Sequence, residues 1–255
     1  MASTGRSPQP LAFLLCFSSF TLVVVLGQGE VPSALVSLSN VTDQFALSVM
    51  RSWSHRVVAL NLSEKALEGT ISPYISNLSF LQVLDLSKDS FHGHLFEHFS
   101  HLPLLDNLSI RKNNFEGLIL QTLSHCQGLQ ILSAHDNQFY GSIPKFLGGL
   151  SEIKCFNILR NRLTGTIPVA LANLTKLEWF IFGQNQIQGN IPPELGSLTH
   201  LMAFIMQMNN VTGTLPESLF NLSALEDLSF MSNQLTGHLP KDAGRFLPNL
   251  QRLYM

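Results

Sequence analysis

The sequence predicts an α/β solenoid, a stack of similar coils that each contribute one short strand to a shared parallel sheet. Three observations lead to this prediction: a 24-residue step between opening leucine-type residues, a glycine in the same place of every unit, and an asparagine in most units. A single unit cannot bury its own apolar face, so neighbouring units must stack. The 255 residues are 45% hydrophobic and 13% charged, with a net charge of −2. This balance disfavours bulk electrostatic binding to nucleic acid or anionic membrane.

The N-terminal residues differ in character from the rest of the chain. Arg6 precedes the apolar run LAFLLCFSSFTLVVVLG, which ends at the small residue Gly27, and a second small residue, Gly29, follows it. This order predicts a cleaved signal peptide over residues 1–29. The run is short for a membrane span, and no second apolar segment of spanning length follows it. We therefore expect no membrane span beyond the signal peptide.

Eight full units cover residues 57–249, and residues 250–255 begin a ninth. Apolar and variable residues alternate at the start of each unit, as in LQVLDL, which is typical of a short strand. We expect the apolar residues to face the core and the variable ones to face a common surface. The residues that open the units are Val57, Leu81, Leu105, Leu129, Ile153, Leu177, Leu201 and Leu225.

An asparagine follows the strand in six units, at Asn113, Asn137, Asn161, Asn185, Asn209 and Asn233. Its amide carries donors and an acceptor, so it can satisfy backbone groups where the chain leaves the strand. Stacked coils would form a ladder of these amides. Lys65 and Asp89 take this position in the first two units, and Ser72, Phe96 and Leu120 replace a later proline in the first three. The ladder is therefore expected to begin at the third unit.

Glycine and proline complete the pattern. The glycines are Gly69, Gly93, Gly117, Gly141, Gly165, Gly189, Gly213 and Gly237, and the prolines are Pro144, Pro168, Pro192, Pro216 and Pro240. Glycine tolerates a turn with positive φ, and proline fixes φ and biases the residue before it to an extended shape. Both residue types therefore predict that the chain turns after each strand.

The segment NRLTGTIPVALANLTKL (161–177) resembles the plant-type leucine-rich repeat, whose units read L-x-x-L-x-L-x-x-N-x-L-x-G-x-I-P. The resemblance implies a right-handed superhelix, with a parallel sheet on the concave face and short 3₁₀ or extended segments on the convex face. The chain resembles ectodomains of plant receptor-like serine/threonine kinases, particularly those of the immune-receptor type. That similarity implies a peptide or protein ligand, a co-receptor as a further partner, and no cofactor.

Residues 30–56 resemble a degenerate N-terminal cap of such ectodomains. TDQFAL (42–47) and SW (52–53) follow the family's order, but only four residues separate them and the usual cysteine pair is absent. A chance match of short strings is the alternative. With no full cap at either end, sheet edges and apolar core would be open, so we expect self-association.

Variable strand positions supply the candidate binding residues. Neighbouring strands lie about 4.8 Å apart, so apolar residues in adjacent units should cluster. Exposed apolar clusters often mark a partner surface, and tryptophan is a frequent anchor. The alternative is a surface with no selected partner. The candidates are Trp179, Ile181, Ile205 and Met208, with His135, Asp136, Arg160 and Gln184 as flanking polar contacts.

Histidines, cysteines and glycosylation sequons are the other residues that could have a chemical role. His92, His94, His98 and His101 could ligate zinc, but they occupy variable positions and solvated histidines are favoured. Cys126 replaces a core leucine, whereas Cys155 falls on the concave surface, so the two should not pair. Sequons occur at Asn40, Asn61, Asn77, Asn107, Asn173, Asn210 and Asn221. Glycans on Asn61 and Asn107 would block the concave face.

No arrangement of catalytic residues is apparent, and the sequence carries no kinase motif. The leading hypothesis is therefore a recognition module: a kinase-less piece of a plant receptor-like kinase in signalling or defence. It would be secreted to the apoplast, or held at the plasma membrane if the gene product continues. One alternative is a secreted polygalacturonase-inhibitor-like protein, although that family carries paired cysteines at both ends. A truncated product without function is the other alternative.

Overall fold

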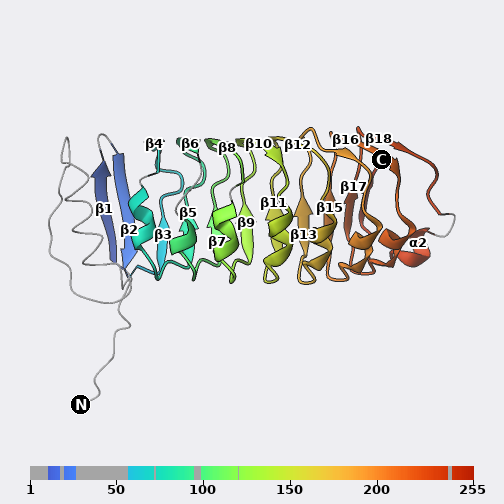
Figure 1. The fold of residues 1–255 in the computed structure, drawn as a ribbon, viewed down its shortest axis with the longest axis horizontal. Helices are drawn as coiled ribbons and strands as arrows, with labels where there is room; N and C mark the ends of the chain where they lie inside the picture. The colour runs from blue at the N-terminus through green and yellow to red at the C-terminus, as the bar shows by residue number, and fades with distance from the viewer. Residues whose placement is uncertain are drawn as a thin grey trace, which may run out of the picture.

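The computed structural model describes residues 11–17, 20–26, 57–71, 73–94, 99–119, 121–240 and 243–255. Its main element is an 11-stranded sheet in which each coil from residue 57 onwards adds one parallel strand beside the previous one (Figure 1). The predicted α/β solenoid is therefore confirmed. In order, the strands are β1 (Leu11–Phe17), β2 (Phe20–Leu26), β3 (Ala59–Asn61), β5 (Val83–Asp85), β7 (Asn107–Ser109), β9 (Ile131–Ser133), β11 (Cys155–Asn157), β13 (Trp179–Ile181), β15 (Ala203–Ile205), β17 (Asp227–Ser229) and β19 (Arg252–Tyr254).

Strands β1 and β2 come from the segment predicted to be a signal peptide. They form an antiparallel hairpin, and Val25 of β2 pairs with Ala59 of β3. The signal peptide itself remains a prediction. The proposed cap remnant over residues 30–56 lies outside the described residues.

Two smaller sheets lie where the chain turns away from the large one. The first has five strands in the order β12 (Arg162–Thr164), β10 (Gln138–Ser142), β8 (Asn114–Gly117), β6 (Ser90–His94) and β4 (Glu68–Gly69). The second contains β14 (Gln188–Gly189), β16 (Asn210–Thr214) and β18 (Gln234–Thr236). A single parallel bridge between Thr166 and Gln188 connects them across neighbouring coils. The eight predicted turn glycines all have positive φ, from 75° to 126°, which a residue with a Cβ resists.

Short 3₁₀ helices return the chain toward the next strand. They are η1 (Pro73–Asn77), η2 (Phe99–His101), η3 (Gln121–His125), η4 (Lys145–Gly149), η5 (Val169–Asn173), η6 (Pro193–Ser197) and η7 (Glu217–Asn221), followed by a short α-helix, α2 (Ala243–Phe246). Proline precedes η4, η5, η6 and η7 in an extended conformation, and its carbonyl accepts the first helical bond, as from Leu171 to Pro168 at 3.1 Å. No described helix has the length and apolar character that crossing a membrane requires.

A continuous apolar core runs between the sheets and the 3₁₀ helices. Each unit's opening residue is nearly inaccessible to solvent, and so are the inward residues of the strands. Cys126 occupies a leucine position, is fully buried, and places its Sγ 3.4 Å from the carbonyl of Leu102. Burial raises the pKa of this thiol to about 12, so it acts as a small apolar side chain. Both Cys126 and Cys155 are free thiols.

The asparagine side chains connect each coil to the preceding one. The amide Nδ2 of Asn137 donates to the carbonyls of Ile110, 2.9 Å away, and Ala134, 3.2 Å away. Its Oδ1 accepts the N–H of Phe115 at 3.0 Å. Asn113, Asn161, Asn185, Asn209 and Asn233 repeat both kinds of bond at the equivalent residues. Each amide therefore satisfies backbone groups in two coils.

Asp89 makes only half of these contacts. Its Oδ1 accepts the N–H groups of Lys65 and Leu67, both at 2.9 Å. Its Oδ2 is buried and has no hydrogen-bond partner among the described residues. Asparagine would place a donor there, whereas an ionised carboxylate has none. Burial accordingly raises the pKa of the Asp89 carboxyl, against the effect of backbone N–H groups of Leu67, Lys65 and Ala66.

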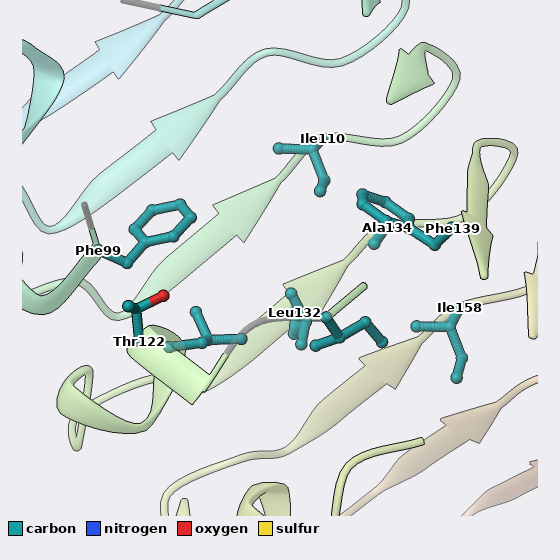
Figure 2. A pocket seen from close by; sticks show the side chains of 9 residues that line it. Phe99, Ile110, Thr122, Leu132, Ala134, Phe139 and Ile158 are labelled. Carbon is teal, nitrogen blue, oxygen red and sulfur yellow. The ribbon is translucent and has the colours of Figure 1, made fainter. Parts of the chain in front are cut away.

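A small apolar cavity of about 20 Å³ lies in the core where Ala134 takes a position that neighbouring coils fill with larger side chains (Figure 2). Ile110 and Ile158 hold the equivalent position one coil before and one coil after. The remaining lining residues are Phe99, Ile119, Thr122, Leu123, Leu132 and Phe139. The cavity therefore marks an interface between coils that is packed less completely than the rest.

Candidate ligand-binding surface

The apolar candidates lie on neighbouring strands of the concave sheet. Residues alternate between faces along a strand, so Trp179 and Ile181 share the outward face of β13 while Phe180 is buried between them. Ile181 pairs with Ile205 of β15, and Trp179 pairs with Ala203. Trp179 is 40% exposed, which is unusual for so large an apolar side chain within a sheet. We call Trp179, Ile181, Ile205 and Met208 the apolar patch.

Aromatic side chains support the apolar patch from below. The inward strand residue is leucine in most coils but phenylalanine at Phe156, Phe180 and Phe204. The ring centroid of Phe180 lies 5.7 Å from that of Phe156 and 5.6 Å from that of Phe204. Phe182 adds a fourth ring, 4.6 Å from Phe180. Such offset contacts restrain the rings, so the strands that carry the apolar patch rest on a closely packed base.

Met208 lies in the loop after β15 and is exposed because of its backbone conformation, unlike the strand residues of the apolar patch. It precedes the ladder residue Asn209 and has a left-handed backbone, with φ of 56°. The same conformation recurs one coil apart in a left-handed column: Glu64, Lys88, Lys112, Asp136, Arg160, Gln184, Met208 and Ser232. Non-glycine residues adopt it at a cost, and backbone bonds between coils, such as Met208 N–H to the Met231 carbonyl at 2.8 Å, hold it in place. Met208 is 47% exposed.

The four polar candidates form one connected chain that leads to the apolar patch. His135 Nδ1 lies 2.7 Å from Asp136 Oδ2, and Arg160 donates to Asp136 Oδ1 at 3.2 Å. Arg160 Nε also donates to Gln184 Oε1 at 2.8 Å. Gln184 is next to Met208 in the left-handed column. Partial burial acts to raise the pKa of Asp136, but the hydrogen bonds from His135 and Arg160 outweigh it and lower that pKa below its usual value.

Polar groups border the apolar patch toward the C-terminus. Ser229, the strand partner of Ile205, is buried and donates to Gln207 Oε1 at 2.7 Å. Toward the N-terminus, Cys155 pairs with Trp179 and is half-buried. Burial, and secondarily Glu178, raises the pKa of its thiol to about 11, so it is protonated at neutral pH. The apolar patch is therefore bounded along the sheet and carries no reactive thiolate.

The remaining candidates are dispersed. His92 and His94 lie on β6 and His101 ends η2, while His98 falls outside the described residues. No group of three metal-ligating side chains occurs in the described part of the chain. Asn77, Asn173 and Asn221 each end a 3₁₀ helix, and Asn210 begins β16. Asn61 and Asn107 lie on strands of the concave sheet, and Asn40 is outside the described residues.

Three further residues in the loops that follow the strands were not predicted from the sequence as part of this surface: Arg111, Lys112 and Met231. Met231 is 37% exposed and lies beside Met208 through the backbone bond between them. Arg111 and Lys112 follow β7 in the same loop positions as His135 and Asp136. The two adjacent basic residues can be read from the sequence. That they form no ion pair with any described residue depends on side-chain geometry, which the sequence does not reveal.

Stacked parallel strands, an asparagine ladder and 3₁₀ returns define a leucine-rich repeat protein of the plant type. The chain belongs to this family, because the family model described as "Leucine-rich repeat region" matches residues 56–255. This confirms the resemblance noted from the sequence. No curated protein matches the chain significantly.

Solved structures similar to this chain include plant receptor ectodomains. The plant peptide hormone receptor RGFR1, in complex with RGF2, is 29% identical over 80% of this chain, with a TM-score of 0.76. The Arabidopsis receptor kinase HAESA ectodomain, in complex with an IDA peptide hormone, is 31% identical over 73%, with a TM-score of 0.70. A plant ice-binding protein is 25% identical over 77%, with a TM-score of 0.58. The chain spans 33% and 31% of the two receptor structures and 72% of the ice-binding protein.

Proposed function

We propose that this chain is an extracellular recognition module that binds an extended peptide, or a peptide-like segment of a protein, across the apolar patch. The observation that carries the proposal is the exposure of Trp179 beside Ile181 and Ile205 on a sheet supported by stacked phenylalanines. Burying such a cluster under a ligand removes apolar surface from water at one place, as binding hot spots do. Its location inside a concave sheet favours a narrow ligand.

The similar receptor structures agree with this proposal, since two of them hold peptide hormones. We propose that the chain is part of a plant receptor-like kinase ectodomain used in signalling or defence, in the extracellular space. Ice recognition has less support. An ice lattice repeats, whereas the facing pairs on the five-stranded sheet change chemistry from His94 and Glu116 to Tyr140 and Arg162.

The test is selection of displayed random dodecapeptides on the secreted chain, followed by affinity measurement with synthetic copies of the selected peptides. Trp179→Ala should weaken those peptides by more than about tenfold, as expected for an aromatic anchor. Tyr140→Ala is the matched control, because Tyr140 is a similarly exposed aromatic residue on β10, in a different sheet. Affinity unchanged by Trp179→Ala, or weakened equally by both variants, would contradict the proposal.

A further inference from the structure

Arg111 and Lys112 are adjacent cations that lie beside the ion-paired residues of the next coils. The Nε atom of Arg111 is buried and has no hydrogen-bond partner among the residues that the structure describes. Neither side chain forms an ion pair with any described residue, although Lys112 is a member of the left-handed column whose neighbours do. A buried polar group without a partner costs free energy, and more so when it is charged. Arg111 is half-buried and Lys112 is exposed, so a ligand can reach parts of both side chains, although not the buried Nε atom.

Three acidic side chains of neighbouring coils already have hydrogen-bonding or ionic partners. Glu64 pairs with Lys88, and its pKa is lowered mainly by that lysine and only secondarily by Arg111. Asp136 bonds to His135 and Arg160. Asp85 accepts both the N–H and the hydroxyl of Ser87. Arg111 and Lys112 therefore form no ion pair with these carboxylates, although the charge of Arg111 acts on Glu64.

We propose that Arg111 and Lys112 bind a carboxylate side chain of the extended peptide whose apolar residue occupies the apolar patch; this inference rests on the proposed function. The guanidinium presents a planar fork that matches a carboxylate, and lysine adds a second charge. The hydroxyls of Ser109 and Ser133, register partners on β7 and β9, lie on the outward face of the same coils. They supply further donors next to the cations.

The geometry sets the spacing between the two peptide residues. β9 and β11 lie between β7 and β13, so the Arg111 coil and the Trp179 coil are three steps apart. At about 4.8 Å per step this is ~14 Å, the length of about four extended residues. The ligand should therefore carry an acidic side chain about four residues from its apolar anchor. By contrast, Asp136, Arg160 and Gln184 are satisfied by one another and have less to gain from a ligand.

The experiment compares dodecapeptides selected on the wild-type chain, on Arg111→Gln/Lys112→Gln and on Trp179→Ala. Wild-type selections should contain Asp or Glu about four positions from an aromatic or aliphatic residue. The double variant should lose the acidic preference and keep the apolar one, and Trp179→Ala should do the reverse. Arg162→Gln is the matched control, since Arg162 is an exposed arginine on β12. Thermal unfolding of each variant establishes that it is folded.

Quantitative outcomes decide between the two proposals. Replacing Asp by Asn in a selected peptide should weaken binding to the wild type about tenfold and leave binding to the double variant unchanged. Equal acidic enrichment on wild type and double variant, or apolar enrichment alone, would overturn this inference and leave the proposed function standing. No enrichment of either kind would overturn both. A glycan on Asn107, in the same coil, would occupy the site and would also contradict the inference.

Discussion

Asp89 accepts the N–H of Leu67 at 2.9 Å, the bond that Asn113 makes to Phe91 one coil later at 3.0 Å. The two residues differ at the other atom of the side chain. Asn113 Nδ2 donates to the Leu86 carbonyl at 2.7 Å, whereas Asp89 Oδ2 has no partner in the described part of the chain. The asparagine ladder thus extends one coil further than its asparagines do, but with an incomplete member.

Asp89→Asn should complete the ladder and stabilise the chain. The new amide would donate to the carbonyls of Leu62 and Leu86, which correspond to the acceptors of Asn113, so we expect a gain of about 1–3 kcal/mol. Denaturant unfolding measures it. The reciprocal change, Asn113→Asp, is the matched control and should lose a similar amount. If Asp89→Asn left the free energy of unfolding unchanged, the unpartnered oxygen of Asp89 would carry no energetic penalty.

The same carboxyl predicts a pH dependence of stability. Its pKa is raised in the folded state above the ordinary 3.8, so its contribution is fully present below pH 3.8 and is lost as pH rises through the folded value. Asp136 acts in the opposite sense, because its lowered pKa gives stability above pH 3.8 that is lost as pH falls. The melting temperature of wild type relative to Asp89→Asn should decrease as pH rises above 3.8. Relative to Asp136→Asn, it should decrease as pH falls below that value. Parallel pH profiles of wild type and either variant would refute the corresponding assignment.

The coils could be predicted well from the sequence because each coil repeats the same residue types at the same positions. Residue type alone indicates the role of the strand leucines, the turn glycines and the asparagines. The described coils show all three in those roles. The left-handed residues were not predicted, since Arg160, Gln184 and Met208 carry no sign of a positive φ in their side chains. Ion pairing along that column, and the lack of an ion pair between Lys112 and any described residue, depend on which rotamers meet across coils.

Ala134→Ile should stabilise the chain by filling the cavity between coils. Isoleucine already occupies the position in the two neighbouring coils, so its shape suits the stack, and we expect a gain of about 1 kcal/mol. Chemical unfolding and a structure of the variant check this. Ile158→Ala is the control that enlarges the void and should cost about 2–5 kcal/mol. Destabilisation by Ala134→Ile would indicate that the neighbouring coils cannot accommodate the added methyl groups.

Sequon occupancy should follow exposure. Asn173 and Asn221 are exposed at the ends of their 3₁₀ helices, whereas Asn107 is half-buried in the middle of the concave sheet. Mass spectrometry of peptides from secreted protein should find glycan on the first two and not on Asn107. Enzymatic removal of the glycans should leave peptide binding at the apolar patch unchanged. A gain in affinity on deglycosylation would show instead that a glycan covers the concave face.

The void at Ala134 also has a mechanical meaning. In a stack, each coil is held mainly by its two neighbours. The stability of the whole stack is therefore approximately the sum of the contributions of the interfaces between successive coils. The interface next to Ala134 lacks the side-chain volume that fills the adjoining ones. Under tension along the long axis, the chain should therefore part there first. The coils that carry Arg111 would then separate from the coils that carry Trp179. A ligand bound to both groups of coils would hold them together and raise the force needed to separate them.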